Sequence, residues 1–323
     1  MYKNLKDFFR RNKKTNEGYF GAPNYKINID LTLLCLTLAS LNALGQQAPN
    51  SVARDSSPTL VSSRFGFTEG PAVDSHGNIF FTDQPNNKIW EYDIHGKLWL
   101  FLDGAGRSNG MYFDKHGNLI TCADEKNQLW LITPKRKVTV LLKDFKGHRF
   151  NGPNDLWIDA KEGIYFTDPY FQRDYWQRTA PDPAIKGERL YYLPKGKKDA
   201  IVVDKNLQKP NGITGNREGY LFVSDIGVGK IFKYELNADG TFKNRRVFAE
   251  DVADGMTLDN KGNLYLAGKG VTVYDSTGER IQHFDIPAKW TSNVCFGGRK
   301  RDVLFITASE SIYILRMCVQ GIE

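Results

Sequence analysis

The sequence predicts an all-β fold made of six similar units, and two observations support this prediction. An acid or an amide precedes a short apolar run that opens a strand six times along the chain. These residues are Glu69, Asn109, Asn154, Asn211, Asp254 and Asn293. The gaps between them are 40, 45, 57, 43 and 39 residues. A repeat of about 40 residues built from short strands and turns is typical of a β-propeller, so we expect a six-bladed β-propeller.

Each unit shows the same order of elements. The strand-forming runs "NIFFTD", "GIYFTD", "YLFVSD" and "NLYLAG" are rich in β-branched and aromatic residues. The segments before them, such as "DSHGN", "DKHGN", "DAKEG" and "DNKGN", predict hairpin turns in which glycine takes the positive φ. A further strand follows in most units. No ten-residue stretch of residues 58–317 keeps an apolar period of 3.6, so we expect almost no helix.

Two units depart from the repeat. The sixth, from Asn293 to about Met317, is one strand short. An open blade would leave an exposed edge, so residues 59–67 are expected to supply the missing strand and close the ring. The third unit is lengthened by "YFQRDYWQRTAPDPAIKGER" at residues 170–189, which we call the insertion.

The first 50 residues have a different composition. A basic segment precedes the apolar run 31–45, which is shorter than the roughly 20 residues that span a bilayer and ends in small residues. We predict a signal peptide and leader at 1–50, a propeller domain at 51–323, and a periplasmic or secreted protein without stable membrane insertion after cleavage. The alternative is an uncleaved amphipathic or anchoring tail.

Charge and cysteine content exclude several classes of function. The net charge is +7, and residues 1–30 hold seven Lys or Arg against three Asp or Glu. About +3 spread over the rest of the chain does not indicate nucleic-acid binding. The four cysteines lack CxxC spacing, so neither a disulfide framework nor a thiolate zinc site is expected. The sequence contains no G-x-S-x-G motif, so a serine hydrolase of that type is not indicated.

The six repeated polar residues predict a central metal-binding channel. Equivalent positions of all blades surround one axis, so hard oxygen ligands distant in sequence would converge there. The alternative is that Asn109-Gly110, Asn211-Gly212 and Asp254-Gly255 are ordinary turn dipeptides. Against it, each unit already has a hairpin turn downstream. Glu69 and Asn154 also occupy the same place without an Asn-Gly or Asp-Gly pair.

An ordered set of motifs carries a family resemblance. The segments are "TEGP", "RFNGPNDLWI", "IYFTDPYF", "KPNGI", "FVSD", "ADGMTLD" and "ITASESIY". Over residues 58–317 the chain resembles the gluconolactonase/regucalcin family of six-bladed propellers. The resemblance implies one divalent cation, typically Ca²⁺, with Zn²⁺, Mn²⁺ or Mg²⁺ as alternatives. The implied ligands are Glu69, Asn154, Asn211 and Asp254, and the implied reaction is opening of a sugar-acid lactone, such as gluconolactone, by water.

The residue types fit this chemistry. Two carboxylates and two amide oxygens leave the ion Lewis acidic, and its shell must be completed by water or substrate. The ion would polarise the ester carbonyl while Asp254 or Glu69 accepts the proton of the attacking water, with Asp254 preferred. The sequence departs from the family pattern at two segments, "CADEKNQ", which contains Asp124 and Glu125, and "TDPYFQ". These differences affect the expected substrate pocket and not the expected metal site.

The loops after the second strands should border the entrance of the channel. They follow Asp83, Asp124, Asp168 and Asp225, whose side chains we expect to bind neighbouring backbone groups. The insertion begins in one of these loops, so its aromatic residues are expected over the entrance; the alternative is a surface flap on the edge of its own blade. The predicted substrate-binding residues are Asn109, Arg149, Asn154, Tyr170 and Trp176.

Three functions from different classes remain open on the sequence. The first is a metal-dependent lactonase acting on a small sugar lactone. The second is a related calcium-dependent phosphotriesterase or esterase. The third is a non-catalytic propeller that binds protein or glycan, against which the filled ligand set argues.

Overall fold

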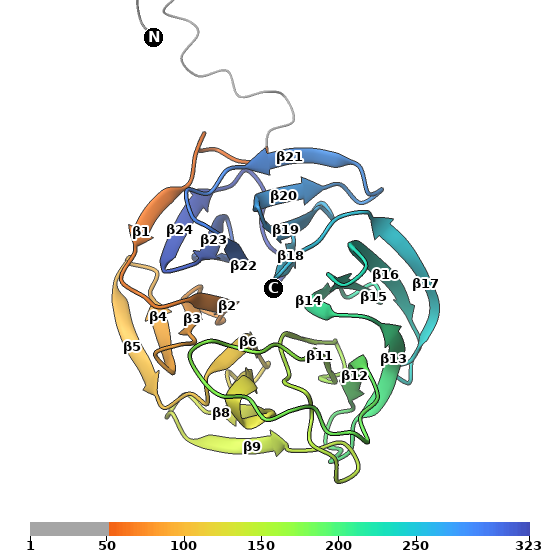
Figure 1. Ribbon diagram of the computed structural model, residues 1–323. Helices are drawn as coiled ribbons and strands as arrows, with labels where there is room; N and C mark the ends of the chain where they lie inside the picture. The colour runs from red at the N-terminus through yellow and green to blue at the C-terminus, as the bar shows by residue number, and fades with distance from the viewer. Residues whose placement is uncertain (1–51) are drawn as a thin grey trace, which may run out of the picture. The chain divides into compact units, whose positions relative to one another are not determined.

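Six antiparallel four-stranded sheets surround a central axis in residues 52–323, the part of the chain that the computed structural model describes (Figure 1). Blade 1 contains β2 (Thr68–Val73), β3 (Ile79–Asp83), β4 (Lys88–Tyr92) and β5 (Leu98–Asp103), and blade 2 contains β6 (Ser108–Phe113), β7 (Leu119–Ala123), β8 (Gln128–Ile132) and β9 (Val138–Leu142). Blade 3 contains β10 (Leu156–Ile158), β11 (Ile164–Asp168), β12 (Glu188–Leu193) and β13 (Ile201–Leu207), and blade 4 contains β14 (Pro210–Gly215), β15 (Tyr220–Asp225), β16 (Lys230–Leu236) and β17 (Phe242–Ala249). Blade 5 contains β18 (Met256–Leu258), β19 (Leu264–Gly268), β20 (Gly270–Tyr274) and β21 (Arg280–Phe284), and blade 6 contains β22 (Thr291–Gly297), β23 (Val303–Ala308), β24 (Ser311–Arg316) and β1 (Thr59–Ser62). The predicted six-bladed β-propeller is confirmed.

The ring closes through the segment predicted to do so. Strand β1 pairs antiparallel with β24, with Thr59 opposite Ile314, and becomes the outer strand of blade 6. The N-terminal part of the domain thus covers the edge that the last unit leaves open. The only helical element among residues 52–323 is one 3₁₀ turn, η1 (Asp124–Lys126). Residues 52–323 contain no helix that is long and apolar enough to cross a membrane.

Aromatic side chains pack adjacent blades together. Phe80 of blade 1 lies edge-on to Phe113 of blade 2, with ring centroids 5.0 Å apart, and Tyr265 of blade 5 meets Phe296 of blade 6 at 5.2 Å. Burying such a side chain contributes roughly 1.5–3 kcal/mol. Because every blade is sandwiched between two others, this packing fixes the inner strands and the side chains that they carry toward the axis.

One predicted turn differs from the structure. Gly77, Gly117 and Gly262 have positive φ, as expected. In "DAKEG", however, the positive φ belongs to Glu162, at 63°, and not to Gly163. Gly163 is required for another reason: a Cβ there would lie 2.0 Å from the hydroxyl oxygen of Tyr192.

The chain ends near the centre of the propeller (Figure 1). Glu323 lines a cavity of about 20 Å³ in the channel, together with Tyr112 and Asp155. Its carboxylate accepts a hydrogen bond from the Thr257 hydroxyl at 3.0 Å. The C-terminal residue therefore fills part of the channel. The predicted leader lies outside the described residues and stays a prediction.

Candidate functional site

All six predicted ring residues belong to the inner strands or directly precede them. Four lie in β2, β6, β14 and β22, whereas Asn154 and Asp254 stand just before β10 and β18. The latter two are still fixed by second strands, because their backbone N–H groups donate to the carbonyl oxygens of Thr167 (2.9 Å) and Ala267 (2.8 Å). Asp254 is partly exposed, and the other five are almost fully buried.

The glycines of the Asn109-Gly110, Asn211-Gly212 and Asp254-Gly255 pairs are not turn glycines. Gly110, Gly212 and Gly255 are absent from the positive-φ residues of the described chain. A Cβ on Gly212 would lie 2.4 Å from the carbonyl oxygen of Asp254, and one on Gly255 would lie 1.9 Å from the Asn293 side chain. These glycines allow one blade's inner strand to approach the next. The interpretation of the pairs as turn dipeptides is therefore wrong.

Hydroxyl groups of second strands fix the ring residues from the neighbouring blade. Thr82 in β3 donates to the carbonyl oxygen of Asn109 at 3.4 Å. Thr167 in β11 donates to the carbonyl oxygen of Asn211 at 2.7 Å. The ring backbone is thus held across blade boundaries, which restrains its side chains in the channel.

Asp254 is oriented by two hydrogen bonds. The Nδ2 of Asn211 donates to Oδ1 at 2.8 Å, and the indole Nε1 of Trp290 donates to Oδ2 at 2.6 Å. The Asn211 amide thereby leaves its Oδ1 buried without a hydrogen-bond partner. Such an unsatisfied acceptor costs roughly 1–3 kcal/mol. A cation or water in the channel would satisfy it.

Glu69 and Asp254 form an electrostatically strained pair. Burial and then the charge of Asp254 raise the pKa of Glu69 well above its usual value, although Gly70 N–H donates to its Oε2 at 3.0 Å. Burial also raises the pKa of Asp254. A divalent cation between them would remove this repulsion. No three His, Cys, Asp or Glu side chains in residues 52–323 form a metal-binding group.

The structure adds residues that the sequence interpretation missed. Asp155 lies in the channel, accepts from Leu156 N–H at 2.9 Å and from the Asn293 side chain, and burial raises its pKa to about 7. Its position directly after Asn154 is a signal that could have identified it. Trp290 lies between two units, where the repeat provides no signal. Asn109 contributes a buried Nδ2 that donates to no partner.

Three of the four second-strand aspartates are structural, as predicted. Asp83 accepts from Gly66 N–H, Asp168 from Gly152 N–H and Asp225 from Lys209 N–H, at 2.8–3.0 Å. Asp124 is different, because its carboxylate binds side chains. It accepts from Gln84 Nε2 at 3.1 Å and from the Arg178 guanidinium.

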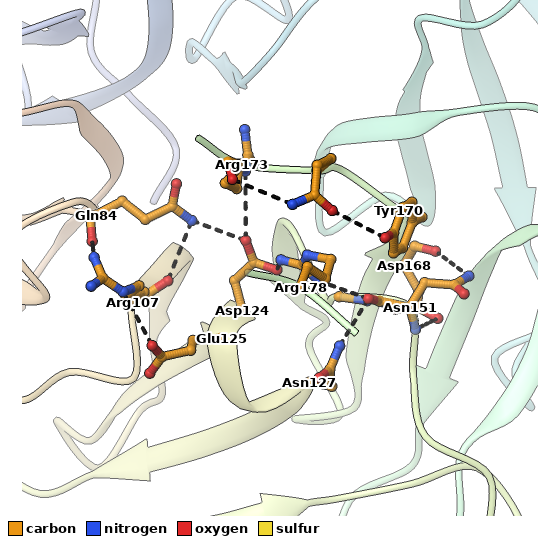
Figure 2. A network of polar contacts seen from close by, with 12 residues as sticks. Gln84, Arg107, Asp124, Glu125, Asn127, Asn151, Asp168, Tyr170, Arg173 and Arg178 are labelled. Atoms are coloured by element: carbon orange, nitrogen blue, oxygen red, sulfur yellow. Dashed lines mark hydrogen bonds and ion pairs between the residues drawn. The ribbon is translucent and has the colours of Figure 1, made fainter. Parts of the chain in front are cut away.

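The insertion lies against the entrance loops of other blades (Figure 2). Arg178 binds both Asp124 of blade 2 and the Asn151 carbonyl oxygen, the latter at 2.7 Å. The Tyr175 hydroxyl donates to Gln84, which follows β3 of blade 1. These contacts extend over three blades, which contradicts the alternative of a flap on the edge of its own blade.

The remaining predicted substrate-binding residues lie in or beside the insertion. The rings of Tyr170 and Trp176 lie 5.9 and 5.2 Å from the Arg178 guanidinium carbon. Arg149 donates to the carbonyl oxygen of Ala180, so it contacts the insertion. A substrate-binding role for these three residues stays a prediction.

Comparison with known proteins identifies the family of this chain. Residues 67–310 match the SMP-30/Gluconolactonase/LRE-like region. The chain belongs to this family. A gluconolactonase of Zymomonas mobilis is 28% identical, covering 80% of each chain, and regucalcin of Oryctolagus cuniculus is 31% identical over 73% of this chain and 80% of that protein. A solved structure of a gluconolactonase from Xanthomonas campestris superposes with a TM-score of 0.76 at 26% identity, covering 83% of this chain and 91% of that one.

Proposed function

We propose that this protein is a divalent-cation-dependent hydrolase that opens the ring of a sugar-acid lactone by attack of water. The observation that carries the proposal is the buried Oδ1 of Asn211, which has no hydrogen-bond partner and belongs to the amide that binds the Asp254 carboxylate. Relatives named gluconolactonase, lactonohydrolase and pentonolactonase support the reaction class.

The residues that would hold the cation are Glu69, Asn154, Asn211 and Asp254. Carboxylate and amide oxygens suit a hard ion such as Ca²⁺, which takes six or more oxygen ligands. When bound, the ion supplies Lewis acidity toward the lactone carbonyl. A calcium-binding regucalcin structure from Agrobacterium tumefaciens shares the fold, with a TM-score of 0.69 at 16% identity.

The chain's own residues would perform the proton transfer and positioning. Asp254 is the better general base because it is partly exposed and both of its oxygens are oriented, by Asn211 and Trp290. A base held in a fixed orientation contributes typically 10²–10⁴-fold. The unpartnered Nδ2 of Asn109 is a buried donor suited to a lactone or hydroxyl oxygen.

A panel of aldonolactones, assayed by acid release, tests this function. We expect hydrolysis of at least one lactone, loss of activity after treatment with a chelator, and recovery on addition of Ca²⁺. Recovery with Zn²⁺, Mn²⁺ or Mg²⁺ would identify a different ion. Hydrolysis that survives complete removal of divalent cations would contradict the proposed dependence.

A phosphorus ester is the second candidate substrate, because a diisopropyl-fluorophosphatase of Loligo vulgaris is 24% identical over 75% of this chain and 86% of that protein. Diisopropyl fluorophosphate therefore belongs in the same panel. Faster turnover of this compound than of any lactone would favour the phosphotriesterase. Turnover of neither class would favour the non-catalytic binding propeller.

We also propose that residues 1–50 direct export to the periplasm or outside the cell and are then removed. The basic segment followed by the apolar run 31–45 supports this proposal. Mass spectrometry of protein isolated from its native host should find a mature N-terminus near the end of this run. Detection of intact Met1 would indicate an uncleaved tail.

A further inference from the structure

The entrance carries a network of paired arginine and carboxylate side chains. In the network of Figure 2, Asp124 lies between the guanidinium groups of Arg173 and Arg178, and Glu125 lies against that of Arg107. Arg107 is paired with Glu125 at 3.2 Å, and Arg178 is hydrogen-bonded to Asp124. Arg173 therefore shares the Asp124 carboxylate with Arg178, which makes the shorter contact to it.

Arg173 is held in place but not hydrogen-bonded to a carboxylate. Its buried Nε donates to no partner, and the closest Asp124 oxygen, Oδ2, is 3.8 Å away. That oxygen already accepts a hydrogen bond from Gln84. The guanidinium carbon lies 4.9 Å from the centroid of the Phe171 ring, which orients the planar group. A guanidinium oriented in this way is preorganised to bind an anion.

The Arg173 guanidinium lies at the entrance of the channel. Its nearest carboxylate, Asp124, follows β7 and is shared with Arg178, and Gln84, which binds the same carboxylate, follows β3 of blade 1. Arg173 therefore keeps an unused N–H donor for an acceptor that enters the channel.

We propose that Arg173 binds an anionic substituent of the substrate, a carboxylate or a phosphate, so that the enzyme selects acidic sugar lactones over neutral ones. This proposal rests on the proposed lactonase function and specifies its substrate class. The planar guanidinium would form two parallel hydrogen bonds to such a group. Arg173 comes from the insertion, so this preference would be a property of this chain's third unit.

The test compares three lactones in the Ca²⁺-loaded protein: D-glucono-1,5-lactone (neutral), D-glucaro-1,4-lactone (carboxylate) and 6-phospho-D-glucono-1,5-lactone (phosphate). Arg173→Gln should lower kcat/KM for the preferred anionic lactone roughly ten- to a hundredfold, because a hydrogen bond to a charged group contributes about 1.5–3 kcal/mol. The kcat/KM for the neutral lactone should change less than about threefold, because it lacks the charged group that Arg173 would bind. The anionic lactone with the larger loss identifies the substituent, and Arg173→Lys should restore part of the activity.

Arg189→Gln is the matched control. It removes the same charge near the end of the insertion, where Arg189 donates to the carbonyl oxygen of Lys186 at 3.1–3.3 Å. The kcat/KM values for all three lactones should stay unchanged in this variant. Equal losses for neutral and anionic lactones in Arg173→Gln, or no loss for either, would overturn the proposal.

A binding measurement separates this proposal from the proposed function. D-glucarate and 6-phosphogluconate, the open-chain anions, are titrated by calorimetry into wild-type and Arg173→Gln protein. At least one of these anions should bind the wild-type protein more than about tenfold more tightly than it binds the Arg173→Gln protein. If no lactone is hydrolysed but this difference in affinity is found, the proposed lactonase function is contradicted and the anion site at Arg173 is supported. Equal binding to both proteins overturns the anion site whatever the activity.

Discussion

Glu69→Gln and Asp254→Asn should each abolish tight cation binding and lower lactone hydrolysis by about 10²–10⁴-fold. Each substitution removes one of the two charges among the four implied ligands, while leaving an oxygen at the same place. Asp254→Asn also removes the proposed proton acceptor, for which losses of this size are typical. Elemental analysis of the purified variants and calorimetric titration with Ca²⁺ measure the binding directly.

Stability provides an independent readout for the same variants. The raised pKa of Glu69 means that its ionised form destabilises the cation-free fold. The fold loses stability as the pH rises from the ordinary pKa of glutamate toward the raised pKa of Glu69. Over this range the folded state holds a proton that the unfolded state has already released. Without cation, Glu69→Gln should therefore be at least as stable as the wild type at neutral pH. Ca²⁺ should raise the Tm of the wild type and not that of the variant.

Glu250→Gln is the control for both measurements. It makes the same change at a side chain that is 81% exposed, near the outer strand β17. Its metal content, Ca²⁺-induced Tm shift and activity should match those of the wild type. Normal metal content in both Glu69→Gln and Asp254→Asn would contradict the ligand assignment.

The propeller could be predicted because its information is local and repeated. Each blade carries its own turn residues and strand pattern, so six weak signals at similar spacing reinforce one another. Even the closing strand β1 followed from the shortage of one strand in the last unit. The ring residues could be listed for the same reason, since one position in each repeat faces the axis.

The features that were missed depend on contacts between units. The pairing of Asp124 with Arg178 joins an entrance loop to an insertion that has no counterpart in the other blades. Trp290 reaches Asp254 from the segment between two blades. The reason for the ring glycines, the close approach of a neighbouring backbone, is visible only once the blades are assembled.

Gly212→Ala should destabilise the fold and weaken the cation site at the same time. The new Cβ would lie 2.4 Å from the carbonyl oxygen of Asp254 and 3.0 Å from the Cα of Gly255, so blade 5 must move away from blade 4. Overpacking of this kind typically costs about 1–3 kcal/mol. The displaced backbone carries Asp254, so its hydrogen bond from Asn211 and the Ca²⁺ affinity should be lost together.

Gly268→Ala separates this steric effect from the general consequences of replacing glycine. Gly268 also lacks a positive φ, and its Cβ would meet only ordinary contacts, with the Val252 carbonyl oxygen at 3.6 Å and the Trp290 ring at 3.9 Å. Both substitutions restrict the unfolded chain similarly, which alone would stabilise by about 0.4–1 kcal/mol. Urea unfolding and Ca²⁺ titration should therefore show Gly268→Ala equal to or more stable than the wild type with unchanged affinity, and Gly212→Ala impaired in both. If the two variants behaved alike, the close approach of blades 4 and 5 would not be what positions Asp254 in the channel.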